Sequence, residues 1–520
     1  MQIEINKFVS EIFYFKLRSS IYFLTIFFSI IQLFISSFDL NILIILFFVN
    51  LISIINLEIS LKRDKLLFYI IPSSIVIFVN FFYLLFPLFI KTILGQNILN
   101  NLEVGFDSFK ISIIYVIIIT LSFSLFTKIT NYSNSFDLKR VLFTKLNLFK
   151  YLDLKNVVII FLITLSIKVY LVIYQNSFVI SEDFGNIFIK FLFGFDKFFY
   201  LPLILIFNLY YANKIKKVFF IYFLITNFLL SIFFGISTNS RAEIFEFITI
   251  IFFCYSIFFI QGKIKIDRGK FVLILFLLII FSFALDAISK RILKFRSLMY
   301  DATPIELFKI TSGLTDVDYK IVDTNLDLNQ EYIYTGFNIL DRFTPIKHLD
   351  KSFYDSSHFA FSDYEDFSKF TKTKMFSLLP QNITRLFIKN YNKIDYQIST
   401  GSKIERLAYN RYGGNRNKGS YIVELILITD SYVFTFSLIA LINLAFFFII
   451  SLFQKIENGK IILSPVIILL IFNILYAPQS DSMSFFITFC IRQPIEMIIL
   501  INILLFFTFK VKKKRLIDLK

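Results

Sequence analysis

Long continuous runs of apolar residues are the feature that most limits how this chain can fold. Runs such as 271–285 and 497–509 contain no charged residue and show none of the two-residue alternation typical of outer-membrane barrel strands. Hydrophobic residues occupy 57% of the 520 positions, Phe alone occupies 73, and the mean hydropathy is +0.72. A soluble protein of this size buries only about three quarters of its surface. The sequence therefore predicts an all-α polytopic membrane protein, and it excludes soluble enzymes, nucleic-acid binders and barrels.

Apolar segments of about 17–25 residues are long enough to cross the hydrocarbon core of a bilayer. By this criterion we predict twelve transmembrane helices, of which the sixth and the eleventh are short. The twelve are centred in residues 20–36, 40–57, 67–90, 111–127, 156–175, 198–212, 218–236, 244–261, 271–288, 432–453, 461–476 and 493–509.

Lys and Arg are distributed unequally between the two sides of these helices. The short segments on the side of the N-terminus carry 27 of them, whereas the short segments on the other side carry 6. Because short cytoplasmic loops are enriched in Lys and Arg, both termini are predicted to be cytoplasmic, with Lys145 inside and Asp355 outside. The basic tail 510–515 is expected at the inner leaflet. No small-residue cleavage site precedes the first span, so no removable signal peptide is predicted.

One segment, residues 289–421, contains no span and separates the ninth and tenth predicted helices. Its 133 residues include 20 Lys and Arg, 15 Asp and Glu, and both histidines of the chain, His348 and His358. A connection of this length is usually functional or disordered, and its interleaved aromatic residues argue against disorder. We therefore predict helices 1–9 in residues 1–288, a mostly helical outward loop at 289–421, and helices 10–12 with the tail at 422–520.

This layout resembles that of bacterial O-antigen polymerases of the Wzy type and of the related O-antigen ligases. Three local stretches are similar to motifs of these families: STNSRAEIFEF (237–247), NILDRFTP (338–345) and NKGSYIVELILITDSYVF (417–434). The chain also departs from the families. It contains no Arg-x10-Gly pattern of the kind described for some polymerases, and neither histidine is followed by Asn as in the ligases.

The resemblance implies an enzyme that transfers a growing glycan from polyprenyl diphosphate to a lipid-linked repeat unit at the outer face of the bacterial inner membrane. The expected partners are that lipid-linked oligosaccharide, as donor and acceptor, membrane lipids and, where chain length is controlled, a regulator protein. No nucleic acid, metal or other cofactor is expected. An O-antigen ligase and a lipid-linked oligosaccharide flippase or other transporter are the alternatives. A transporter should show repeat-like halves and charges near the middle of the membrane, whereas the charges of this sequence cluster outside.

A diphosphate at the outer face calls for arginine, because the planar guanidinium matches phosphate oxygens and stays charged at low dielectric. Arg241 lies on the short outward turn 237–243, directly before a helix whose N-terminal amides favour an anion. A snorkelling interfacial arginine is the alternative interpretation. The other candidates lie near the two membrane junctions of the loop, where a lipid-binding basic rim is the alternative: Arg291, Arg296, Arg406, Arg411 and Arg416.

The acceptor hydroxyl also needs a general base. The candidates are Glu424, which follows the loop on a helix that re-enters the membrane, Glu246, which follows Arg241, and the two histidines. The sequence leaves the choice among these four open.

Three weaker signals are interpreted conservatively. Lys168 lies inside the fifth span, where snorkelling explains it as well as a site does. Arg492 and Glu496 lie one helical turn apart and are predicted to pair. Asp316-Val317-Asp318 has the form of a glycosyltransferase metal motif but is attributed to coincidence in an Asp-rich stretch.

Overall fold

The structure is a computed structural model that describes residues 3–5, 11–62, 69–130, 152–178, 187–238, 242–260, 334, 344–376, 381–389, 391, 396, 398–410, 419–457, 460–476 and 482–517. Within these ranges the fold is helical apart from one small sheet, and nine helical segments are long and apolar enough to cross a membrane. The prediction of a polytopic helical membrane protein is therefore confirmed. The ninth predicted span, 271–288, lies outside the described residues.

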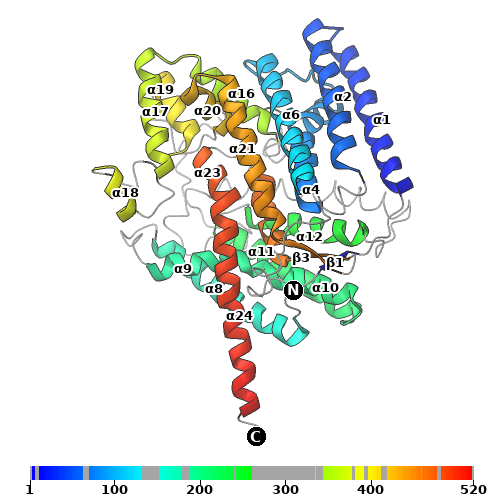
Figure 1. Cartoon of the computed structure of the whole chain (residues 1–520), viewed down its shortest axis with the longest axis vertical. Coiled ribbons are helices and arrows are strands. Elements are labelled where there is room, and N and C mark those ends of the chain that lie inside the picture. The colour runs from blue at the N-terminus through cyan, green and yellow to red at the C-terminus, as the bar shows by residue number, and fades with distance from the viewer. Residues whose placement is uncertain are drawn as a thin grey trace, which may run out of the picture.

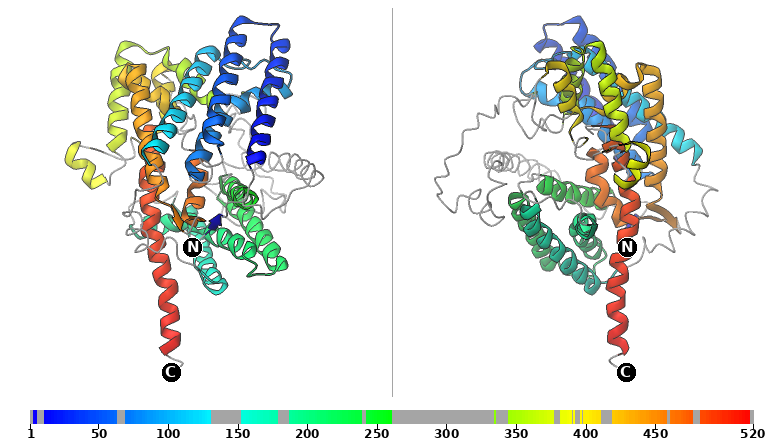
Figure 2. Two further views of the ribbon diagram at one scale, coloured as in Figure 1. Left: turned by 45° about the vertical axis from the view of Figure 1, so that its right-hand side comes forward. Right: turned by 90° about the vertical axis from the view of Figure 1, so that its left-hand side faces the viewer.

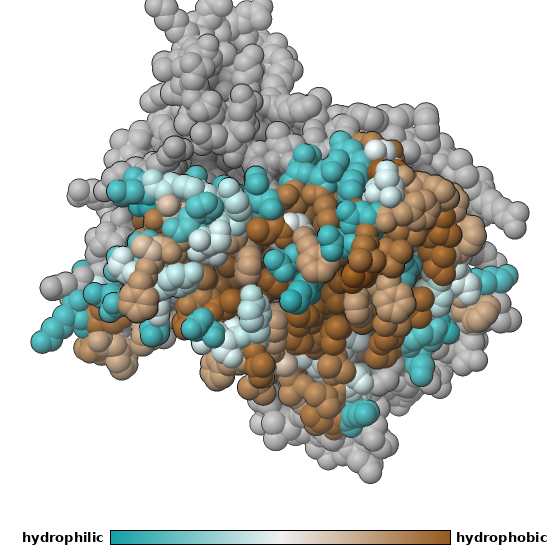
Figure 3. Space-filling view, turned by 90° about the horizontal axis from the view of Figure 1, so that it is seen from above, coloured by the Kyte–Doolittle hydropathy of each residue, from teal (hydrophilic) through white to brown (hydrophobic). Residues whose placement is uncertain are grey.

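The N-terminal helices form an upright bundle with α21 (Figure 1). Its members are α1 (Glu11–Ile35), α2 (Leu40–Ser60), α4 (Ile70–Asn80), α5 (Phe86–Ile93), α6 (Gly105–Ile129) and α21 (Tyr432–Ser451). Aromatic rings fill the contact between α6 and α21, where Phe447 lies 5.9 Å from Phe123 and 5.8 Å from Phe126 between ring centroids. The outward faces of α1 and α2 are also apolar, as Phe23 and Phe47 show. Such faces are suited to lipid. Seen from above, along the bundle, the described surface shows apolar residues in its middle, with polar residues interspersed and towards its edges (Figure 3).

A second group of helices lies below this bundle and inclines differently (Figures 1 and 2). It consists of α8 (Leu154–Phe178), α9 (Ile187–Phe195), α10 (Leu201–Tyr211), α11 (Lys217–Ser237) and α12 (Ala242–Ile260). The buried helix α22 (Pro465–Tyr476) packs against α10 and α12 and also reaches α4. The short α23 (Met483–Ile487) leads into α24 (Gln493–Ile517), which extends past the rest of the molecule towards the C-terminus (Figure 1).

A small antiparallel sheet joins the N-terminal segment to the connection after α21. Its order is β1–β3–β2, with β1 (Ile3–Ile5), β2 (Gln454–Glu457) and β3 (Lys460–Leu463). The sequence between β2 and β3 is Asn-Gly, a strong hairpin signal. The predicted span at 461–476 is therefore wrong in its first residues, which form β3. Because β3 occupies the start of that segment, only the 12 residues of α22 are helical, about 18 Å against a hydrocarbon core of about 30 Å.

The described residues between 344 and 429 are mostly helical and form what we call the cap, which continues past the predicted end of the loop at 421. The position of this loop between two spans stays a prediction. The cap consists of α16 (Pro345–Ser356), α17 (Phe361–Phe376), α18 (Gln381–Phe387), α19 (Thr400–Tyr409) and α20 (Tyr421–Thr429). Asp350 of α16 attaches the cap to the start of α6: its carboxylate accepts hydrogen bonds from the backbone N–H of Glu103 (2.7 Å) and Val104 (3.1 Å) and from the hydroxyl of Ser108 (2.8 Å). The cap is therefore bonded to the membrane bundle.

The cap and the sheet lie at opposite ends of a membrane helix. Helix α21 follows α20 of the cap after a two-residue turn and ends three residues before β2. Its 20 residues separate the two by about 30 Å. This agrees with the charge count, which places the N-terminus and 454–460 on one side and the loop on the other. Which of these sides is cytoplasmic stays a prediction.

Three of the nine spans are interrupted by a short turn of different helical pitch, and a proline follows each interruption. Proline has no N–H to continue the α-helical ladder, so the preceding backbone shifts to another spacing. The interruptions are a π-helical turn at Phe81–Leu85 before Pro87, a 3₁₀ turn at Asp196–Tyr200 before Pro202, and a π-helical turn at Thr488–Arg492 before Pro494.

The predicted orientation can be tested with cysteines placed at exposed positions. Asp355 is unsuitable because it is only 3% exposed, whereas Glu365 on α17 is exposed. We expect a membrane-impermeant maleimide to label Glu365→Cys in intact cells, or in spheroplasts where an outer membrane intervenes, and to spare Lys216→Cys. The native Cys254 and Cys490 are buried, so the unmodified protein serves as the background. Labelling of position 216 but not 365 would reverse the orientation.

Candidate functional site

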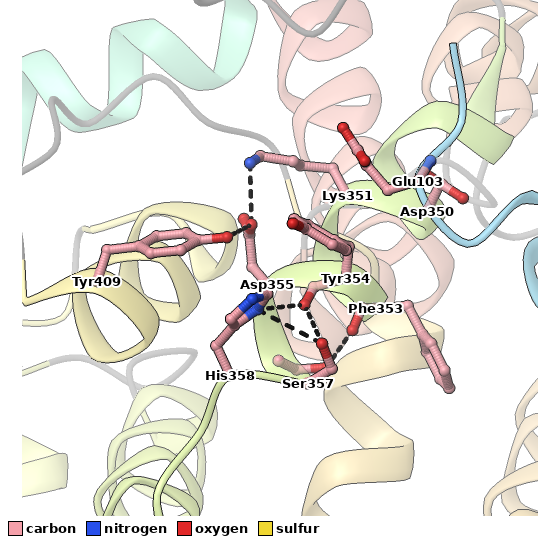
Figure 4. Close-up of polar contacts among 10 residues, drawn as sticks. Glu103, Asp350, Lys351, Phe353, Tyr354, Asp355, Ser357, His358 and Tyr409 are labelled. Atoms are coloured by element: carbon pink, nitrogen blue, oxygen red, sulfur yellow. Dashed lines mark hydrogen bonds and ion pairs between the residues drawn. The ribbon is translucent and has the colours of Figure 1, made fainter. Parts of the chain in front are cut away.

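Five residues of the cap gather at the C-terminal end of α16, and we call them the cap cluster: Lys351, Tyr354, Asp355, His358 and Tyr409 (Figure 4). The buried carboxylate of Asp355 is 2.9 Å from Nζ of Lys351 and accepts a hydrogen bond of 2.9 Å from the hydroxyl of Tyr409. Burial and this carboxylate raise the pKa of Tyr409 above its usual value. The phenol therefore stays protonated and ties α19 to α16.

His358 is the exposed member of the cap cluster. Its Nδ1 lies 3.0 Å from the backbone carbonyl oxygen of Tyr354, and its ring lies 4.9 Å from the ring of Tyr354 and 5.4 Å from that of Tyr409 between centroids. A carbonyl oxygen only accepts hydrogen bonds, so Nδ1 carries the proton in the neutral ring and Nε2 is the acceptor. Nε2 has no hydrogen-bond partner within the described residues. The histidine can thus accept a proton from a group outside the chain.

The other predicted base and arginine candidates of the cap have different surroundings. Arg406 lies on α19, one turn before Tyr409, and is half-buried. His348 is half-buried on α16, ten residues before His358. The carboxylate of Glu424 is almost completely buried and accepts a 2.5 Å hydrogen bond from the backbone N–H of Met483, the first residue of α23. Glu424 therefore anchors α20 to the start of α23, where an acid is favoured by the helix dipole.

A second polar group lies among the apolar helices, and we call it the buried charge cluster: Lys168, Asp196, Lys197, Glu243 and Glu246. Nζ of Lys168 lies 2.8 Å from Asp196 and 2.6 Å from Glu243, and its side chain is only 4% exposed. The hydroxyl of Tyr200 also donates to the Glu243 carboxylate, at 3.1 Å. Lys168 is thus paired inside the molecule, and the explanation by snorkelling is wrong.

Glu246 and Lys197 complete this cluster on its other side. Oε1 of Glu246 is shielded from solvent and has no hydrogen-bond partner among the described residues. Lys197 donates to Oε1 of Gln493 at 3.4 Å, and Asn473 donates to the same oxygen at 3.0 Å. A carboxylate oxygen without a partner at low dielectric is able to bind a proton or a polar group of a ligand.

The buried charge cluster is joined to α22 and α24 through Gln493, whose Oε1 accepts hydrogen bonds from Lys197 and Asn473. Gln493 follows Met483 of the cap end by ten residues, about 15 Å along a helix, and Asn473 follows Ser464 of the sheet end by nine, about 13 Å. Two of the three helix interruptions, at 196–200 and 488–492, border the cluster. Lys168, Asp196 and Lys197 thus lie within two candidate membrane spans, Leu154–Ile173 and Phe191–Tyr211, although the second of these spans was predicted to begin only at residue 198.

A signal for this placement was present in the sequence. The predicted span 198–212 has only 15 residues, about 22 Å of helix, which is too short to cross the hydrocarbon core. The structure begins this span earlier, at Phe191, and ends it at Tyr211. The earlier start brings Asp196 and Lys197 into the membrane-spanning part. The predicted pair Arg492–Glu496 is confirmed, with Nε 2.6 Å from Oε1.

Five arginine candidates and the Asp-x-Asp motif lie outside the described residues: Arg241, Arg291, Arg296, Arg411, Arg416 and Asp316–Asp318. In the part of the chain that the structure describes, no group of three or more His, Cys, Asp and Glu side chains could hold a metal ion. Comparison with models of known families, with curated proteins and with solved structures finds no match to this chain. The function is therefore argued from the two clusters.

The pairing of Lys168 predicts a large loss of stability when the ammonium is removed. Lys168→Met leaves two carboxylates without their buried partner, which costs about 3 kcal/mol. Arg492→Met is the matched control, because its ion pair is about half-exposed and contributes less than about 1 kcal/mol. Thermal unfolding of the detergent-solubilised variants measures both. Equal unfolding temperatures for the two variants would contradict a structural pairing of Lys168.

Proposed function

We propose that the chain is a polysaccharide polymerase, which transfers a growing glycan from polyprenyl diphosphate to a lipid-linked repeat unit at the outer face of the bacterial inner membrane. The observation that carries the proposal is the setting of His358. Its tautomer leaves Nε2 as an acceptor, it lies between two tyrosines, and it belongs to a cap that Asp350 bonds to the membrane bundle.

The cap cluster supplies the groups that such a transfer requires. The acceptor hydroxyl oxygen would attack the anomeric carbon of the donor, its proton passing to Nε2 of His358 while the bond to the diphosphate oxygen breaks. Tyr354 and Tyr409 offer aromatic faces on which sugar rings can stack. In this proposal Asp355 holds Tyr409 and Lys351 in position, without touching the substrate.

Charge stabilisation of the leaving diphosphate is assigned to the arginines. Arg406 is carried by α19 beside the cap cluster, and Arg241 directly precedes α12 in the sequence. A cation near the leaving oxygens is favoured because their negative charge grows during the transfer. The assignment of Arg241, and of the other arginines outside the described residues, rests on their positions in the sequence alone.

The two histidines provide a matched pair of variants for testing the base. His358→Gln removes the ring nitrogen that accepts the proton, and we expect the rate of polymerisation to fall about 100-fold or more. His348→Gln changes the same residue type on the same cap and should leave the rate nearly unchanged. The measurement is the chain-length distribution formed from lipid-linked repeat units by purified protein in liposomes.

Protein levels and unfolding temperatures of both variants must match those of the unmodified protein for this comparison to hold. Full activity of His358→Gln would remove His358 as the base. Loss of activity in His348→Gln alone would transfer the function to that residue.

A lipid-linked oligosaccharide flippase or other transporter is the second candidate, and the buried charge cluster favours it. Paired and unpaired ionisable groups buried among membrane-spanning helices, beside helix interruptions, are typical of transport pathways. Lys168, Lys197 and Glu246 meet this description. The cap, by contrast, is not required for transport.

Deletion of the gene separates the candidate functions by the product that accumulates. Loss of a polymerase should leave single repeat units on the final lipid carrier and no long chains. Loss of a flippase should trap repeat units at the cytoplasmic side, and loss of a ligase should leave full-length polymer on polyprenyl diphosphate. Analysis of the lipid-linked and finished glycans by mass spectrometry and gel electrophoresis distinguishes the three. Either of the last two products would overturn the polymerase proposal.

A further inference from the structure

A small projection leaves the cap at the end of α17, well away from the cap cluster. Helix α18 projects sideways there (Figures 1 and 2). It is fixed to α17 by a 2.9 Å hydrogen bond from the hydroxyl of Thr384 to the backbone carbonyl of Phe376, and by stacking of Phe387 on Phe376 with centroids 6.1 Å apart. The projection is thus attached at a defined angle.

The projection presents large apolar side chains without covering them. Leu386 is 81% exposed, Phe387 is 66% exposed, and Phe376 is also exposed. The exposure of nonpolar groups of this size to water is unfavourable. Contiguous exposed apolar residues therefore indicate a surface that contacts something else.

The charges around these residues are of one sign. Exposed Lys372, Arg385 and Lys389 surround the apolar side chains, and the sequence contains no Asp or Glu between positions 366 and 395. The charges of α17 are also divided along its length. Its acidic residues, Asp363, Glu365 and Asp366, all lie in the first half of the helix, and its lysines lie in the second half, next to the projection. The apolar surface thus lies at the basic end of α17.

We propose that this projection docks into the lipid bilayer on the side of the membrane where the cap lies. Apolar side chains surrounded by Lys and Arg fit the boundary between acyl chains and phosphate head groups, with the rings entering the apolar region and the cations contacting phosphates. The acidic residues at the start of α17 are repelled by the phosphate head groups, so this end of the helix is expected to stay away from the bilayer. Docking would hold the cap at a constant height above the membrane, and it is independent of the reaction proposed for the cap cluster.

The absence of Trp from the chain allows a direct test. Phe387→Trp introduces the only indole into the projection, and Phe361→Trp introduces it at the acidic end of α17, where Phe361 is 91% exposed. The full-length variants are reconstituted into liposomes of phosphatidylethanolamine and phosphatidylglycerol, with or without brominated acyl chains. We expect blue-shifted emission and quenching by the brominated lipid for position 387, and neither for position 361.

A charge variant tests the contribution of the cations. Arg385→Glu combined with Lys389→Glu in the Phe387→Trp background should reduce the quenching, because the new carboxylates are repelled by phosphate groups. Emission from position 387 that is quenched by iodide in water and not by brominated lipid would overturn the proposal. Blue-shifted emission that neither agent quenches would also overturn it, since it would indicate a protein partner in place of lipid.

Discussion

The hydrogen bonds of Asp350 are the interaction on which the arrangement of the cap depends. A buried carboxylate is stable only when its oxygens are fully satisfied, and here two backbone N–H groups at the start of α6 and the hydroxyl of Ser108 satisfy it. The contact connects residues more than 240 positions apart in the chain. Because the next two turns of α16 and the residues that follow carry Lys351, Tyr354, Asp355 and His358, this attachment, together with the packing of Ile346 and Leu349 in the core, positions the cap cluster relative to the membrane helices.

The two polar clusters differ in their access to water, and this difference separates their possible functions. In the cap cluster, Asp355 is buried and paired while His358 is exposed, so structural and reactive groups are distinct. In the buried charge cluster, Lys168 is held by two carboxylates and Glu246 keeps an oxygen without a partner in the described residues. The first arrangement suits the transfer of a proton from a large external substrate to His358. The second suits a proton or ion inside the membrane.

Much of the fold, but little of the site, could be predicted from the sequence. Long apolar runs predict membrane helices because nothing else buries them, and the boundaries at 40, 217 and 432 agree with the structure within about one residue. The sequence offered Glu424 as a candidate base, whereas in the structure its buried carboxylate accepts a hydrogen bond from the N–H of Met483. That partner lies 59 residues further on, a separation that no local pattern reveals. The sequence offered His348 and His358 equally as candidate bases. Only the structure distinguishes them, because Nδ1 of His358 lies against the carbonyl oxygen of Tyr354.

By itself the sequence determined that the chain crosses a membrane many times, that its short connecting segments differ in their content of Lys and Arg, and that residues 289–421 contain no apolar run long enough to span a membrane. These properties follow from local composition, because each apolar segment is long enough to cross the hydrocarbon core of the bilayer whatever the rest of the chain does. Only the tertiary structure decided that Lys168 meets Asp196 and Glu243, and that the carbonyl of Tyr354 fixes the proton of His358. The free energy of a buried charge depends on which distant residue approaches it, and that is a property of packing.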